Sequence, residues 1–196
     1  MSDDGPAVVK AAMARLDHIH RLSGQIVSDV AAIEMATEAA IAPFFASGAS
    51  IMPLREWVLW RISLSDKVGI LEHIADAIGI KAQTTIRRLR RANEIRNDLA
   101  HSQVTYNIGA TSGESFVEEF HQWQKARASR GGYRMRPVDL TQLEHQAAFT
   151  SMLDYEVMRI FAAVLARKEG QDPVARLATM DAANPELAAQ MEIPEP

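Results

Sequence analysis

The chain has 196 residues and a formal net charge of −4 at pH 7. Apolar residues make up 47% of it and charged residues 23%, which is an ordinary composition for a globular protein with a substantial core. Proteins that bind nucleic acid through charge alone are usually basic overall, so any contact with nucleic acid must use a local patch. The absence of cysteine excludes disulfides, thiol nucleophiles and cysteine-containing zinc sites.

The sequence carries no signal for a membrane or for export. No stretch approaches the roughly 18 successive apolar residues that a membrane-spanning helix needs. The first residues, Met1 to Pro6, have neither the basic end nor the apolar run of a secretory signal. We therefore expect a cytoplasmic protein without membrane contact, and the Ala- and Arg-rich composition indicates a bacterial source.

The first predicted element is a long helix from about residue 7 to 42. Apolar side chains recur there at steps of three to five, as one face of an amphipathic helix requires. Pro43 should end or kink this helix, and residues 43–53 indicate a connection with a short turn. A bulky apolar segment follows, and we expect its Trp57 and Trp60 to anchor the core.

Two further helices precede the middle of the chain. Ser63 or Ser65 is a suitable N-cap for the first of them, with Asp66 in its first turn. Gly79 provides a C-terminal stop, because glycine readily adopts the left-handed conformation that ends helices. The next helix is predicted over 83–100, with an apolar stripe at helical spacing beside a dense run of arginines.

The helical pattern of the sequence is interrupted between residues 103 and 137. Short extended pieces separated by glycines predict a small β-hairpin or irregular insertion, although 116–128 could equally be helical. Asp139 or Thr141 then caps a last long helix. From residue 169 the chain is polar and punctuated by prolines, which predicts a flexible tail.

These elements predict an all-α helical bundle. Its single domain spans residues 1–168, with the insertion at 103–137 between helices, and residues 169–196 form the tail. The pattern contains no repeat of solenoid length. No residue cluster indicates a cofactor or a metal, since His18 and His20 point to different helix faces and further ligands are missing.

The most informative residues are Arg96, Asn97 and His101, at the end of the helix 83–100. RNA can be cleaved without a metal when a base removes the 2′-hydroxyl proton and a cation stabilises the phosphorane. Histidine suits the first role because it titrates near neutrality, and the planar fork of arginine suits the second; the asparagine can donate to a phosphate or fix the arginine. Arg96 and His101 lie about 140° apart on a regular helix. Either the helix frays near Ala100, or a partner's helix completes the site.

Each of these features also has a purely structural interpretation. Arg96 and His101 could form a buried polar cluster that ties the helix end to a neighbour. Arg87, Arg88, Arg90 and Arg91 could be an RNA-binding track of phosphate contacts, or a solvated face with salt bridges to acidic neighbours.

The string 94–102, with Arg-Asn-x-x-x-His at its centre, resembles the signature of the HEPN superfamily, and the resemblance extends loosely to 64–80 and 141–167. These domains are helical bundles that usually dimerise, and many are metal-independent ribonucleases of toxin–antitoxin, phage-defence and RNA-processing systems. The resemblance implies that Arg96 and His101 are catalytic and that Asn97 supports them. It also implies a homodimer, RNA as substrate, and a cognate antitoxin or regulatory protein as a partner.

The same string is similar to the mannitol operon repressor family, whose helical domain carries an Ile-Arg-Asn-x-x-Ala-His-Ser run without established nuclease chemistry. Two hypotheses therefore stand. The first is a HEPN-type endoribonuclease that cleaves RNA by 2′-hydroxyl attack, and the second is a non-catalytic helical regulator or interaction module. An accessible His101 beside Arg96 favours the enzyme, and a buried one favours the module.

Overall fold

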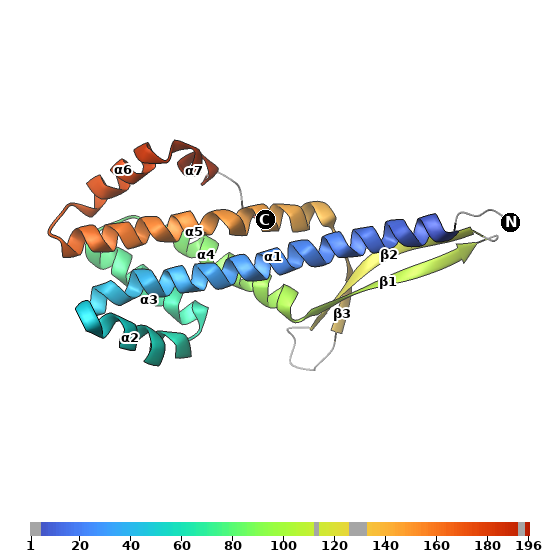
Figure 1. The fold of residues 1–196 in the computed structure, drawn as a ribbon, viewed down its shortest axis with the longest axis horizontal. Coiled ribbons are helices and arrows are strands. Elements are labelled where there is room, and N and C mark those ends of the chain that lie inside the picture. Colours follow the sequence, from blue (N-terminus) through green and yellow to red (C-terminus); the bar gives the residue numbers. More distant parts are fainter. Residues whose placement is uncertain (1–4, 112–113, 126–132, 192–194) are drawn as a thin grey trace. The chain divides into compact units, whose positions relative to one another are not determined.

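The computed structural model describes residues 5–111, 114–125, 133–191 and 195–196. Within these ranges the chain forms seven α-helices and three β-strands (Figure 1). The helices are α1 (Gly5–Phe45), α2 (Ile51–Trp57), α3 (Leu64–Ile78), α4 (Gln83–Ala100), α5 (Leu140–Lys168), α6 (Pro173–Ala183) and α7 (Pro185–Gln190). The strands are β1 (Ser102–Thr111), β2 (Glu114–Lys125) and β3 (Tyr133–Pro137), and two short 3-10 turns are η1 (Gly48–Ser50) and η2 (Leu59–Arg61). The predicted helical bundle with a small β insertion is confirmed.

The chain divides into two compact units. The first unit contains residues 1–27 and 95–147, and the second contains 28–94 and 148–196. Helices α1, α4 and α5 each contribute to both units. Residues 169–196 belong to the second unit, and the predicted domain boundary at residue 168 stays a prediction.

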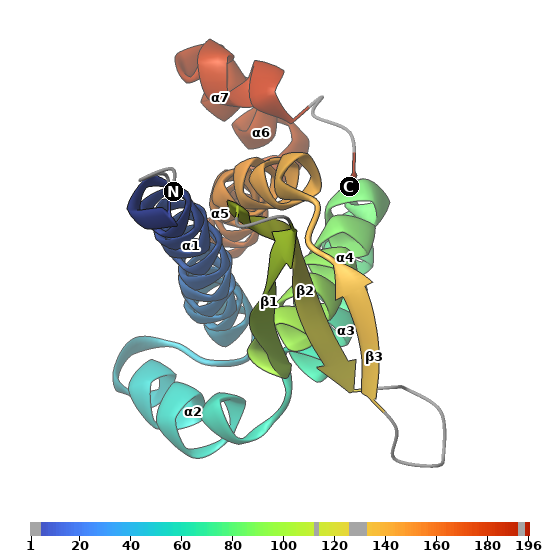
Figure 2. The ribbon, with the colours of Figure 1, turned by 90° about the vertical axis from the view of Figure 1, so that its right-hand side faces the viewer.

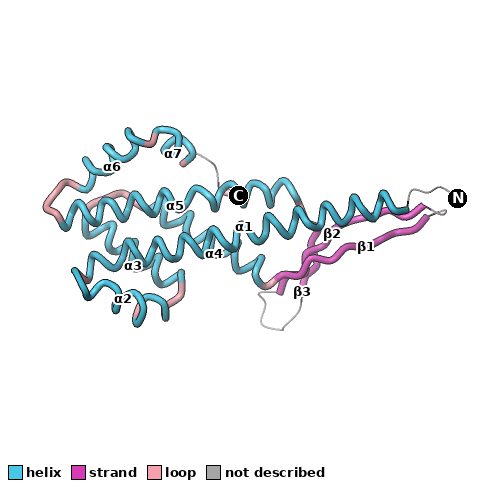
Figure 3. Tube along the Cα trace, in the orientation of Figure 1, coloured by secondary structure: helices cyan, strands magenta, loops and turns pink. Residues whose placement is uncertain are grey.

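The first unit holds all three strands. They form an antiparallel sheet in the order β1-β2-β3, with β2 in the centre (Figure 2). The register of β1 against β2 shifts between Asn107 and Ile108, which is the mark of a β-bulge or irregularity. Figure 3 shows that the strands occupy the single stretch between α4 and α5. The described residues of 116–128 belong to β2, so the alternative prediction of a helix there is wrong.

The second unit is built from amphipathic helices whose apolar faces meet in a core. Apolar side chains that recur at helical spacing in α3, α4 and α5 are buried. The largest contributors include Ile33, Leu71, Ile74, Ile86, Leu89, Phe149 and Leu153. Removal of this apolar surface from water drives the packing, at about 25 cal/mol per Å².

The predicted helix ends are largely confirmed by their capping groups. The Ser63 hydroxyl accepts a hydrogen bond from the backbone N–H of Asp66 at 3.2 Å and so caps α3. Gly79 ends the same helix in the left-handed conformation, with φ of 78°. Asp139, rather than Thr141, caps α5, because its carboxylate accepts from the N–H of the third residue along the chain at 3.1 Å.

Most of the described residues after Lys168 are helical, although the composition predicted a flexible tail. Pro173 and Pro185 each stand at the first turn of a helix, where the missing N–H costs nothing and the fixed φ is favourable. Arg159 of α5 donates to the Asp181 carboxylate of α6 at 2.6 Å, and the Tyr155 hydroxyl donates to the same carboxylate at 3.3 Å. The prolines that contributed to the prediction of a flexible tail therefore start helices here.

Candidate functional site

The three motif residues lie at the C-terminal end of α4, in the part of this helix that belongs to the first unit, just before β1. They are Arg96, Asn97 and His101. The backbone N–H of His101 donates to the Asn97 carbonyl at 3.2 Å, so helical hydrogen bonding continues through His101 although α4 is assigned to Ala100. Strand β1 begins at the next residue. One version of the predicted site required the helix to fray near Ala100, but its hydrogen bonding continues up to His101.

This geometry decides which motif residues share a face. Asn97 and His101 are four residues apart and lie one above the other on the helix surface. Arg96 stays about 140° from His101 around the helix axis. The carboxamide is thus placed beside the imidazole, whereas the helix by itself does not bring the guanidinium to that side.

Exposure differs among the three residues. His101 is exposed, whereas Arg96 and Asn97 are half-buried. An exposed imidazole is open to a substrate, and it is not the centre of a buried polar cluster. An accessible His101 was expected for the enzyme and a buried one for the regulatory module, and the side chain is accessible.

Arg87 and Arg90 of the predicted RNA-binding run are exposed and Arg91 is half-buried, and all three belong to the second unit and already have partners. Arg87 Nε donates to Glu195 Oε1 at 2.6 Å, Arg90 Nη2 to Glu72 Oε2 at 2.6 Å, and Arg91 Nη1 to Glu94 Oε2 at 3.2 Å and Nη2 to the Pro196 backbone oxygen at 3.0 Å. Exposed ion pairs of this kind contribute about 0–1 kcal/mol each. A phosphate could therefore replace these partners at little cost.

Arg88 does not belong to an RNA-binding surface, which corrects the prediction. Its side chain is 2% exposed and forms a buried ion pair with Glu156 of α5. The same guanidinium donates to the Met191 carbonyl at 2.8 Å and lies 5.3 Å from the centre of the Phe149 ring. The reason is helical phase, since Arg88 directly precedes Leu89 and falls on the buried stripe of α4. Burial raises the pKa of the Glu156 carboxyl, against the opposing effects of Thr85 and Arg88.

A second buried ionic cluster lies in the same unit and was missed by the sequence reasoning. Lys67 of α3 donates to Glu34 at 2.6 Å and to Glu38 at 2.7 Å, both on α1. The side chains of Lys67 and Glu38 are 2% and 3% exposed. A signal for it was available, because Lys67 is four residues before Leu71 and thus interrupts an apolar stripe. Such a cluster joins two helices rather than presenting chemistry to solvent.

His18 of the first unit forms a polar cluster with two neighbours. Arg21 Nη2 lies 2.8 Å from His18 Nδ1, and His18 Nε2 lies 3.0 Å from a Glu144 carboxylate oxygen. Because arginine can only donate, Nδ1 must accept and Nε2 must carry the proton that Glu144 accepts. Both ring nitrogens are thus engaged, and the sequence analysis did not foresee this cluster.

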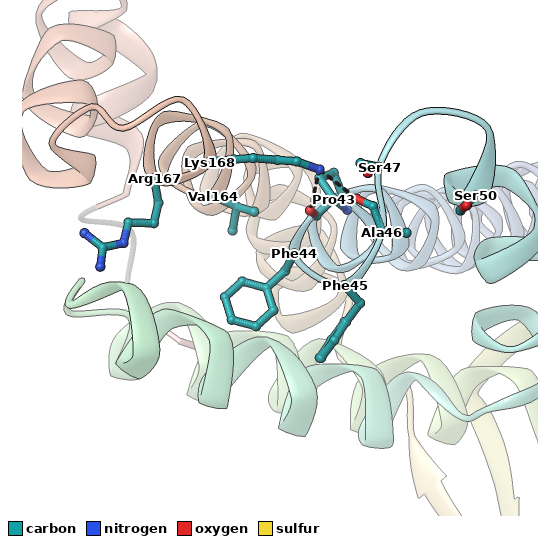
Figure 4. A pocket seen from close by; sticks show the side chains of 9 residues that line it. All are labelled: Pro43, Phe44, Phe45, Ala46, Ser47, Ser50, Val164, Arg167 and Lys168. Carbon is teal, nitrogen blue, oxygen red and sulfur yellow. Dashed lines mark hydrogen bonds between the residues drawn. The ribbon is translucent and has the colours of Figure 1, made fainter.

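The second unit has a cavity of about 520 Å³ at the end of α1 (Figure 4). Its lining combines apolar and hydroxyl side chains with two cations, and consists of Pro43, Phe44, Phe45, Ala46, Ser47, Ser50, Val164, Arg167 and Lys168. Lys168 Nζ is committed to the carbonyls of Pro43 and Ala46, at 3.0 and 2.6 Å. The lysine therefore caps the C-terminus of α1, where a positive charge is favourable. A second cavity of about 430 Å³ lies between α5 and α6 and is lined mainly by apolar groups.

The described residues contain no group of three or more histidine, aspartate or glutamate side chains arranged to hold a metal ion. None of the helices in the described ranges has the length and apolarity needed to cross a bilayer. No protein-family model, no curated protein and no solved structure matches the chain. The resemblance to HEPN domains therefore depends on the motif and on its place in a helical fold.

Proposed function

We propose that this protein is a metal-independent endoribonuclease of the HEPN type, acting in toxin–antitoxin or phage-defence systems. The observation that carries the proposal is the exposed His101 at the end of α4, with Asn97 one helical turn before it on the same face. An accessible general base with an adjacent amide donor is what proton transfer beside a phosphate requires.

The proposed reaction assigns one role to each motif residue. His101 accepts the proton of a 2′-hydroxyl, and the resulting oxygen attacks the adjacent phosphorus. Arg96 stabilises the negative charge of the phosphorane, and Asn97 donates to a phosphate oxygen. The bond to the 5′-oxygen breaks, that oxygen takes up a proton, and the products carry 2′,3′-cyclic phosphate and 5′-hydroxyl ends.

The angular separation of Arg96 and His101 makes a homodimer part of this proposal. A two-fold contact near the motif would let the arginine of one chain serve the histidine of the other, using one self-complementary surface. Arg87, Arg90 and Arg91 would bind RNA phosphates in place of their present partners.

The proposal is tested with purified protein and a single-stranded RNA in EDTA. We expect cleavage that leaves cyclic phosphate ends and that falls about 10²-fold or more in His101→Ala, the usual effect of losing an acid–base group. His20→Ala is a matched control, because His20 is another exposed histidine, on α1. Equal cleavage by His101→Ala and the unmodified protein would remove this residue from the mechanism.

The second candidate is a non-catalytic regulatory or interaction module resembling the mannitol operon repressor family. The observation that favours it is the pairing of Arg87, Arg90 and Arg91 with carboxylates and a carbonyl of the same unit, as in a solvated structural face. Under this alternative, RNA stays intact with every variant, while binding to a protein partner responds to changes in the motif.

A further inference from the structure

The segment 51–61 presents large apolar side chains that nothing within its unit covers. Five of the seven residues of α2 are apolar, yet none is buried, and in η2 only Leu59 is buried. Trp57 is 71% exposed and Trp60 is 67% exposed. The sequence had placed both rings in the core, so the structure corrects that prediction. We call Trp57, Val58 and Trp60 the tryptophan surface.

Such a surface is unusual on a protein that stays alone in water. A seven-residue helix has little stability of its own, and it would normally be held by burying its apolar side chains. Clustered exposed apolar groups mark interaction sites, and tryptophan is among the residues that dominate the energy of protein contacts. The neighbouring Phe45, which lines the cavity of Figure 4 together with Ser50 at the start of α2, is also 62% exposed.

The charges beside the two tryptophans are of opposite sign. Glu56 directly precedes Trp57, and Arg61 directly follows Trp60. Both are exposed, and neither forms an ion pair with another residue in the described ranges. A two-fold contact would bring Glu56 of one copy to Arg61 of the other, and vice versa. An anionic lipid surface or an RNA would gain from the arginine but be repelled by the glutamate.

Trp57 and Trp60 are only three residues apart and both are largely exposed, so one partner can contact both rings. We propose that a second copy of this chain covers the tryptophan surface through an isologous contact centred on Trp57 and Trp60.

This inference does not depend on the proposed function. The tryptophan surface lies in the second unit, and the motif lies in the first. Pairing of motif helices would be a separate contact, and a chain that uses both would form assemblies larger than a dimer. In either case, loss of the tryptophan contact lowers the measured mass.

Sedimentation of the full chain over the micromolar range tests the proposal. We expect at least twice the 21.7 kDa chain mass, and a dissociation constant raised about 30-fold or more by Trp57→Ala or by Trp60→Ala, as for interface hot spots. Val174→Ala is the matched control, because this α6 side chain is 56% exposed but lies outside the surface. Circular dichroism should show that all variants keep their helices, since the replaced rings are in solvent.

A charge exchange gives an independent test that a loss of folding cannot imitate. Glu56→Arg alone and Arg61→Glu alone should each weaken association, because like charges then face each other. The double exchange should restore it. A chain that stays monomeric, association that ignores both tryptophans, or a double exchange without rescue would overturn the proposal. Binding to anionic vesicles or to RNA that is lost in Trp57→Ala would instead identify another occupant.

Discussion

Replacing Arg87 and Arg91 together by alanine tests whether α4 holds an RNA. The two side chains are 67% and 35% exposed, and their present partners are weak competitors for a phosphate. Each phosphate contact to a single strand contributes about 0.7 to the slope of log K against log salt concentration, because bound cations are released. Loss of two contacts should therefore make the slope shallower by about 1.4. Arg88 contributes nothing to this count because it is buried.

The assay is fluorescence anisotropy of a labelled single-stranded RNA over a series of salt concentrations. Arg167→Ala is the matched control, since it removes an exposed arginine of α5 from outside the run. Glu195→Gln should act in the opposite direction by freeing Arg87, and should strengthen binding by no more than about fivefold, the equivalent of 1 kcal/mol for an exposed pair. An unchanged affinity and slope in the double variant would show that the run is only a solvated, salt-bridged face.

Two further predictions concern the buried charges of the second unit. Lys67→Met should lower the free energy of unfolding by about 3–5 kcal/mol in urea titrations, because the buried Glu38 loses its hydrogen-bonded cation and keeps, among the described residues, only Arg55, 4.0 Å away. Adding Glu38→Gln should recover part of this loss. A loss below about 1 kcal/mol would refute the reasoning. The raised pKa of Glu156 means that its contribution to stability is fully present below the pKa of the unfolded chain and declines as pH rises through the folded value. The stability of Glu156→Gln relative to the unmodified protein should therefore increase from acid toward neutral pH, and a difference independent of pH would contradict the assignment.

The helices were predictable because the signals that form them are local. The spacing of Ile86 and Leu89 follows the helical period, and Ser63 and Gly79 are short-range capping signals. A β insertion could be predicted because glycines separate extended, β-prone pieces, but the sequence left open whether 116–128 is a strand or a helix. The motif was visible for the same reason, since Arg96, Asn97 and His101 lie within six residues.

The failures have a common origin in features that depend on more than a few neighbouring residues. Arg88 looked like its three neighbours, but the phase of α4 turns it toward Glu156. Trp57 looked like a core residue, but nothing in its unit covers it. Pro173 contributed to the prediction of a flexible tail, but a proline that follows a capping aspartate is favoured at the start of a helix.

The sequence alone determined the helical class, the extents of α3 and α4, and the place of the motif at a helix end, because backbone hydrogen bonding and amphipathic periodicity are written in successive residues. The tertiary structure alone decided which charges are buried, that the end of the chain packs on α4 and α5, and that His101 is exposed. Whether a side chain is buried depends on which elements pack against each other, and this packing is determined by the total free energy of the whole unit. A pattern of a few neighbouring residues therefore cannot predict it.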